Sequence, residues 1–201
     1  MVVAITTMKC QDPRMTAEVH VLTNGYVGDR VASTVTLIRD GESLIVVDPG
    51  MVANRGAILD PLANLGVDPG AVTDIVLSHH HPDHTLNAAL FPEARVHDFM
   101  ATYVADLWID RHDDESGLSD SVRLLRTPGH SAEDITTLVQ TDSGLTVLTH
   151  LWWHADGPAE DPYAPDPAVL RRSRQHVLGL QPSLIIPGHG APFTPHASIA
   201  R

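Results

Sequence analysis

The alternation of apolar and polar residues first predicts a β-hairpin near the start of the chain. Two runs rich in aliphatic residues, VASTVTLIR at 31–39 and SLIVVDPG at 43–50, flank the tripeptide Asp-Gly-Glu. An Asp-Gly pair between two such runs is a strong short-range hairpin signal. The second run is almost continuously apolar, as expected for a strand that is buried on both faces.

The next segment predicts a helix followed by a strand. In NRGAILDPLANLG, residues 54–66, three apolar residues recur at helical spacing, and Gly66 occupies the place of a glycine that follows a helix. Pro61 marks either a helix start or a kink. The β-rich segment DIVLS, residues 74–78, then leads into a run of histidines. Strand, helix and strand in this order indicate an α/β architecture.

The middle of the chain predicts mostly strands. We expect a strand at 94–97, a helix at 98–108 with Asp98 as its cap, and a polar loop at 111–120. Three strand-like runs follow within 121–150, and each ends near a histidine or a turn of Gly, Asp or Ser.

A Pro-rich acidic loop at 151–167 precedes the last predicted helix. Asp166 and Pro167 favour a helix start at 167, and the helix is expected to run to about residue 181. Its arginines are expected on a solvated face: Arg171, Arg172 and Arg174. A final strand is expected at 183–187. The whole pattern predicts one α/β domain over residues 1–201.

Composition narrows the classes of function. Of 201 residues, 43% are hydrophobic and 19% are charged, which is ordinary for a globular protein. The net charge is −12 and no block of Lys or Arg forms a basic stripe, so we expect a small-molecule substrate and no nucleic-acid partner. The lack of a signal sequence and of an apolar run of about 18 residues predicts a cytoplasmic protein with no membrane partner. The oligomeric state stays open, with a homodimer among the options.

A dense histidine cluster is the main candidate for chemistry. The segment SHHHPDHT, residues 78–85, holds four potential ligands: His79, His81, Asp83 and His84. Such residues on a turning backbone can converge on one metal ion, and we expect His80 to alternate away. Two further histidines follow Pro-Gly pairs near predicted strand ends, His130 in TPGH and His189 in PGHG. A metal site built from several strand ends is therefore expected.

This four-part pattern resembles the metallo-β-lactamase-fold hydrolase superfamily from about residue 20 to 193, and most closely its small single-domain members. The resemblance implies an α/β fold, an αββα sandwich with a metal site along one edge. It also implies one or two zinc ions, with iron or manganese also compatible. Carried over by motif, the two ions would be held by His79, His81 and His130 and by Asp83, His84 and His189. Asp48, in IVVDPG, matches a family aspartate that lies beneath the site and organises its loops.

One position departs from the family pattern. Members of the family usually carry a Gly-Asp pair at the end of the strand after TPGH, and that aspartate bridges two metals. Here the pair reads Thr149-His150. A neutral imidazole binds one metal through one nitrogen and cancels no charge. We therefore expect His150 either as a metal ligand or as a neighbour of the ligands. The site would then be dinuclear without a carboxylate bridge, mononuclear, or empty.

The resemblance implies hydrolysis of a small ester-like bond (thioester, lactone or amide) by a metal-bound hydroxide, with Asp83 as the catalytic residue that orients it. Three alternatives stay open: a nuclease or phosphodiesterase, a mononuclear iron sulfur dioxygenase, and a metal-binding domain that has lost catalysis. Aromatic residues of the 151–167 loop can wall a pocket or pack the loop onto the sandwich: Trp152, Trp153 and Tyr163. Three polar residues are expected mainly outside the ligand set: His97, His154 and Asp156.

Overall fold

The computed structural model describes residues 16–200, whose strands form two sheets. The first sheet has 7 strands in sequence order: β1 (Glu18–Thr23), β2 (Val35–Asp40), β3 (Ser43–Val47), β4 (Asp74–Val76), β5 (Arg95–His97), β6 (Ala101–Val104) and β7 (Leu107–Asp110). The second sheet has 5 strands in the order β12-β11-β10-β9-β8. These are β8 (Glu115–Gly117), β9 (Val122–Arg126), β10 (Ile135–Thr141), β11 (Gly144–Thr149) and β12 (Leu184–Pro187). The helices are α1 (Gly56–Asn64), α2 (Pro82–Thr85) and α3 (Pro167–Gly179), with 3-10 turns at Pro69–Ala71 and Ala88–Leu90.

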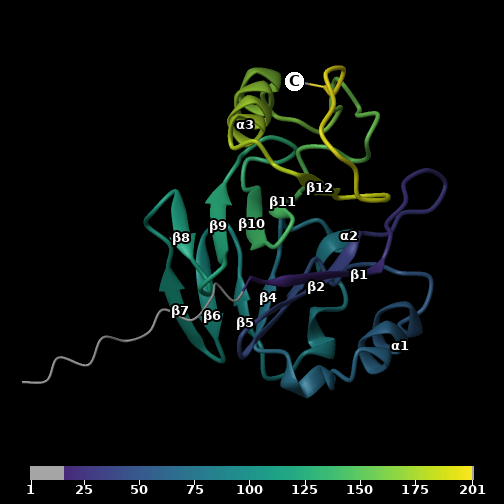
Figure 1. Cartoon of the computed structure of the whole chain (residues 1–201), viewed down its shortest axis with the longest axis vertical. Coiled ribbons are helices and arrows are strands. Elements are labelled where there is room, and N and C mark those ends of the chain that lie inside the picture. Colours follow the sequence, from purple (N-terminus) through teal and green to yellow (C-terminus); the bar gives the residue numbers. More distant parts are fainter. Residues whose placement is uncertain (1–15, 201) are drawn as a thin grey trace, which may run out of the picture.

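Helices cover the outer faces of the two sheets, so the molecule has four layers (Figure 1). The alternation within the hairpin strands explains the layering, because successive side chains of a strand point to opposite faces. On β2, Ile38 belongs to the core between the sheets, whereas Leu37 packs in the core that contains Ile58 and Leu62 of α1. A third core joins α3 to the second sheet. The predicted αββα sandwich is confirmed.

The predicted first hairpin and its following helix are present. β2 pairs antiparallel with β3, and Asp40 opposite Ser43 leaves a two-residue turn in which Gly41 has φ +60°. Gly tolerates this left-handed conformation at no steric cost. In α1, Ile58 and Leu62 are buried as the helical spacing predicts, and Pro61 lies inside the helix rather than at its start.

The predicted helix at 98–108 is wrong, because this segment forms the antiparallel hairpin of β6 and β7. The β-rich residues of this segment pair across a turn at Ala105 and Asp106, and Ala105 has φ +53°. Asp98 accepts hydrogen bonds from the backbone N–H groups of Met100 and Ala101 at 2.7 and 2.8 Å, so its carboxylate caps a turn instead of a helix. The predicted polar loop at 111–120 also contains the short strand β8.

The last helix begins as predicted, with the side chain of Asp166 accepting a hydrogen bond from the N–H of Ala168 at 2.8 Å. The expectation of a solvated arginine face is wrong for Arg174, which is fully buried, while Arg171 and Arg172 are exposed. Within residues 16–200, none of the helices has the length and apolar character needed to cross a membrane.

Candidate metal centre

The ends of five strands deliver the candidate residues to one edge of the sandwich. Asp48 follows β3, and the segment from His79 to His84 follows β4, with Asp83 and His84 on α2. His130 follows β9 by four residues, His150 directly follows β11, and His189 follows β12. Parallel pairing of β3 with β4 and of β11 with β12 brings the carboxyl ends of these strands to the same edge.

The first predicted group of ligands is assembled. Nδ1 of His81 lies 2.9 Å from Nε2 of His79 and 3.1 Å from Nε2 of His130. The imidazoles of His79 and His81 are nearly perpendicular, with their ring centroids 4.5 Å apart. Three ring nitrogens therefore converge on one point from three directions, as ligands of a single ion would.

The second predicted group lies beside the first. Oδ2 of Asp83 is 3.4 Å from Nε2 of His84 and 3.6 Å from Nε2 of His189. His150 points inward, and its Nε2 is 3.1 Å from Nε2 of His189. His150 belongs to two histidine triads of the described residues whose ligand atoms lie within 4.8 Å of one another: His79 with His130 and His150, and His84 with His150 and His189.

Nδ1 is held by a protein group in four of these rings, those of His79, His84, His130 and His189. Nδ1 of His84 contacts Oδ2 of Asp48 at 2.9 Å, and Nδ1 of His189 contacts the carbonyl oxygen of Ala32 at 2.8 Å. Nδ1 of His79 contacts the hydroxyl of Ser78 at 3.0 Å. Such outer partners set the orientation of ligand rings in metal sites. Asp48 also accepts the N–H of Ser78 at 2.7 Å, so one carboxylate ties the ring of His84 to the start of the histidine segment. Its role in organising a metal site stays a prediction.

Burial and charge keep most of these rings neutral. Burial and the repulsion of neighbouring imidazoles hold the pKa of His79 and of His150 well below the ordinary value, and lower the pKa of His189 to about 4. A neutral imidazole has a free lone pair, which is the form that binds metal. For His84, burial lowers the pKa, but Asp48 and Asp83 outweigh it and raise the pKa to about 9. The negative charges of Asp48 and Asp83 therefore favour a positive charge next to them, either on a protonated His84 or on a metal ion beside it.

The donor set fits a divalent metal. Nδ1 of His150 is buried and has no hydrogen-bond partner among residues 16–200, and Nε2 of His84, also buried, has only the carboxylate of Asp83 beside it, at 3.4 Å. Buried polar atoms are rarely left without a good partner, so these two ring nitrogens, within a cluster of seven donors, indicate a further partner such as a metal ion. The residues that would hold it are those of the two groups: His79, His81, His130, Asp83, His84, His189 and His150. Which of them bind remains a prediction.

A cavity of about 410 Å³ opens over this cluster. Its floor includes His81, Asp83, His130 and His189, and its walls are mainly apolar: Val27, Gly28, Val31, Pro82, Trp153 and Tyr163. The rings of Trp153 and Tyr163 stack with their centroids 5.8 Å apart. Trp152 is instead buried in the third core and donates its indole N–H to the carbonyl oxygen of Ala200. The loop at 151–167 therefore has both of the roles considered from its sequence: Trp153 and Tyr163 line a cavity, and Trp152 packs the loop onto the sandwich.

Sequence reasoning missed Asp161. This buried carboxylate contacts Nδ1 of His130 at 2.8 Å through Oδ2, and the same oxygen accepts the indole N–H of Trp153 at 2.8 Å. Burial raises the pKa of Asp161, but hydrogen bonds from His130 and from the backbone of Tyr163 lower it overall. The only available signal was the acidic character of the 151–167 loop, which does not say which carboxylate turns inward.

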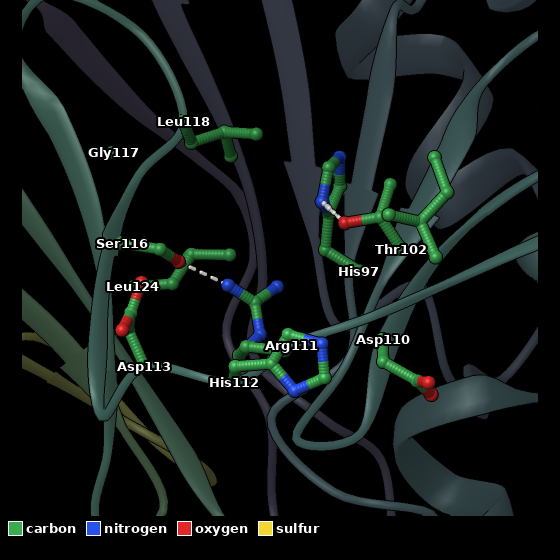
Figure 2. A pocket seen from close by; sticks show the side chains of 11 residues that line it. His97, Thr102, Asp110, Arg111, His112, Asp113, Ser116, Gly117, Leu118 and Leu124 are labelled. Atoms are coloured by element: carbon green, nitrogen blue, oxygen red, sulfur yellow. Dashed lines mark hydrogen bonds between the residues drawn. The ribbon is translucent and has the colours of Figure 1, made fainter.

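Other candidate residues lie outside the cluster. His80 turns to Oδ2 of Asp98 at 2.9 Å, and His154 and Asp156 are exposed. His97 contacts the carboxylate of Asp74 at 2.7 Å and the hydroxyl of Thr102 at 2.9 Å. Figure 2 shows this last contact in the wall of a second cavity, of about 260 Å³, whose lining includes none of the cluster residues.

Comparison with known proteins places the chain in a family. The family model of the metallo-beta-lactamase superfamily matches residues 28–100. Metallo-beta-lactamase domain-containing protein 1 of Xenopus laevis is 34% identical over 194 residues, which cover 87% of this chain and 80% of that protein. The human protein of that name is 36% identical over 160 residues, and the match spans 59% of its length.

Solved structures show the same fold at lower identity. A Thermotoga maritima protein described as a metallo-beta-lactamase superposes with a TM-score of 0.72 at 22% identity, covering 90% of this chain and 100% of that one. A quorum-quenching N-acyl homoserine lactone hydrolase superposes with a TM-score of 0.62 at 21% identity, covering 87% and 91%. The chain belongs to the metallo-β-lactamase superfamily, among the relatives of metallo-beta-lactamase domain-containing protein 1.

Proposed function

We propose that the protein is a metal-dependent hydrolase of a small, uncharged ester-like bond: a thioester, a lactone or an amide. The observation that carries this proposal is the convergence of six histidines and Asp83 beneath one cavity of about 410 Å³. A divalent metal held there would lower the pKa of a bound water toward neutrality and polarise a carbonyl oxygen. Imidazole-rich sites suit zinc, and iron or manganese tolerate the same donors.

Asp83 is the side chain best placed to move a proton. It borders both the cavity and the cluster, and burial, which raises its pKa, is outweighed by hydrogen bonding to His84 and by the nearby imidazoles, so that the pKa falls to about 2. Asp83 is therefore ionised at neutral pH and can accept a hydrogen bond from an attacking water and orient it. Because a pKa of about 2 makes Asp83 a weak base, the metal would have to acidify that water before Asp83 could carry its proton to a leaving group.

The cavity walls favour an uncharged substrate with an apolar group. No Lys or Arg is among the described residues that line the cavity, and its one lining carboxylate is that of Asp83. Apart from the metal itself, a phosphodiester backbone would meet no cation in this cavity, so the nuclease alternative is less well supported. Trp153 and Tyr163 offer an apolar surface directly beside His130, with ring centroids 5.9 and 5.7 Å from that of His130.

The test is a substrate panel on protein loaded in turn with zinc, iron and manganese. Lactones come first, because a neighbour of this fold is a lactone hydrolase; thioesters, amides and a phosphodiester follow. We expect turnover of a neutral acyl substrate that is lost in His79→Ala. Turnover of the phosphodiester alone would favour the nuclease. Oxygen uptake with a persulfide would favour the sulfur dioxygenase. No turnover in any arm would leave a metal-binding domain without catalysis.

A further inference from the structure

We propose that Arg174 and Asp161 act together as positioning residues for the metal centre. Arg174 holds the segment 151–161 in place, and Asp161, at the end of that segment, orients His130 through a hydrogen bond. The inference rests on the metal centre and not on the proposed hydrolysis. Its test therefore measures metal affinity, and a failure of the hydrolase proposal would leave it untouched.

Arg174 is a buried cation that binds only neutral acceptors. Its guanidinium donates three hydrogen bonds of 2.8 Å, from Nε to the carbonyl oxygen of Leu151, from Nη1 to that of Ala159 and from Nη2 to that of Pro158. No carboxylate lies within ion-pair distance of it among residues 16–200. Burying a cation without a contacting carboxylate is costly: burial lowers the pKa of Arg174, and the nearby negative charge of Asp161 offsets this only in part. An aliphatic residue at this buried position of α3 would have a lower free-energy cost of burial. We therefore infer that Arg174 is there for the specific arrangement of its three hydrogen bonds.

That geometry is a clamp on both ends of one loop. Leu151 directly follows His150, and Ala159 lies two residues before Asp161. The planar fork of the guanidinium holds these distant carbonyl groups in one plane, which a lysine ammonium cannot do. The ring of Trp152 lies 5.8 Å below the same guanidinium. The loop is therefore tied to α3 at two places around its turn.

Asp161 is the point where the clamped loop meets the metal centre. Its Oδ2 contacts Nδ1 of His130 and accepts the indole N–H of Trp153, both at 2.8 Å, and its Oδ1 accepts the N–H of Tyr163 at 2.9 Å. One buried carboxylate thus orients a predicted metal ligand and both aromatic walls of the cavity. A small displacement of the loop would rotate His130 and move Trp153 together.

The test is a double-mutant cycle on zinc affinity, measured by competition with a chromophoric chelator, with melting temperature recorded for each variant. We expect Asp161→Asn to weaken zinc binding about 10-fold or more, because outer partners of ligand histidines contribute on this scale. Arg174→Lys should weaken it about 5-fold or more while the protein stays folded. The double variant should bind zinc about as weakly as Asp161→Asn alone, because both changes act through one contact.

Arg171→Lys is the matched control, because Arg171 is exposed on the same helix. This substitution should leave zinc affinity unchanged. If Arg174→Lys does not fold, Arg174→Gln takes its place in the cycle, since its amide can still donate to two carbonyl groups. Zinc affinity within 2-fold of the wild type in the Arg174 variant, with only the melting temperature lowered, would overturn the inference and leave Arg174 a structural residue. Losses of affinity that multiply in the double variant would also overturn it.

Discussion

The imidazole of His150 rests directly against the α-carbon of Gly188. A Cβ atom at Gly188 would overlap the ring, reaching Cδ2 and lying 2.8 Å from Nε2. Gly188 of the PGHG motif therefore leaves space for the ring of His150. This space lets His150, the residue that departs from the family pattern, point toward the metal centre.

Replacing Gly188 should disturb the centre through this contact. We expect Gly188→Ala to weaken zinc binding at least about 10-fold, because His150 must rotate out of its place between the two triads. Gly179→Ala is the control, since a Cβ atom at Gly179 meets nothing within 4 Å and should leave affinity unaltered. Equal zinc affinity in both variants would show that the position of His150 does not matter for binding.

Restoring a carboxylate at position 150 tests the number of ions. An aspartate cancels one charge and can bridge two cations, so we expect His150→Asp to hold a second ion more tightly than the wild type does. The measurement is elemental analysis of protein purified without a metal-affinity tag, with both forms titrated in parallel. If the wild type already holds two ions at equal affinity, His150 is a full substitute for the bridging carboxylate.

Removing the metal should lower stability. A ligand at about 100 times its dissociation constant stabilises the native state by about 2.7 kcal/mol. For a chain of this length that corresponds to a loss of roughly 5–10 °C in melting temperature when a chelator is added. Calorimetry with and without chelator measures the loss, which should be smaller in His79→Ala because one ligand of the first group is removed. A chelator effect of full size in His79→Ala would place the bound metal on the second group alone or outside the cluster.

The ionisation of Asp74 should make the free energy of unfolding depend on pH in the acidic range. Burial raises its pKa, but hydrogen bonds from His97, Arg95 and Thr73 prevail and lower the pKa to about 2. A lowered carboxylate pKa stabilises the folded state above the unfolded pKa of about 4, and this contribution is lost as the pH falls from about 4 to about 2. We expect Asp74→Asn to cost about 1–2 kcal/mol at pH 7 and almost nothing near pH 2.

This comparison is made by denaturant unfolding of chelated wild type and variant, so that the metal does not contribute. The difference between the two proteins should shrink as the pH falls. A constant difference between pH 7 and pH 3 would mean that the ionisation of Asp74 does not contribute to stability.

The two adjacent tryptophans should behave differently. Trp152 is fully buried, so Trp152→Ala should cost about 3–5 kcal/mol of unfolding free energy. Trp153 lines the cavity, so Trp153→Ala should mainly raise KM for substrates with an apolar acyl group. Chemical denaturation and steady-state kinetics separate the two effects. An unaltered KM in Trp153→Ala would remove this residue from the substrate surface.

Local patterns in the sequence determined the elements whose causes lie within a few residues. Asp-Gly between apolar runs predicted the hairpin of β2 and β3, and Asp166-Pro167 predicted the start of α3. The spacing of His79, His81, Asp83 and His84, with the two Pro-Gly-His motifs, predicted a metal cluster, and the structure brings these side chains together. Turn and cap chemistry and short ligand spacing act through neighbours in the chain.

Only the tertiary structure decided the features that depend on distant partners. The segment 98–108 contains β-rich residues, but it became a hairpin because β6 pairs with the edge of β5, and the residues of the segment do not reveal that this edge is available. His150 turns inward because Gly188, which directly follows β12, leaves space for its ring. Arg174 and Asp161 are buried because carbonyl groups and His130, far away in the chain, are brought to meet them. Whether a polar side chain is buried, and which group it pairs with, depends on contacts between residues that are far apart in the chain. A sequence predicts such contacts only where a local motif already indicates which residues will meet.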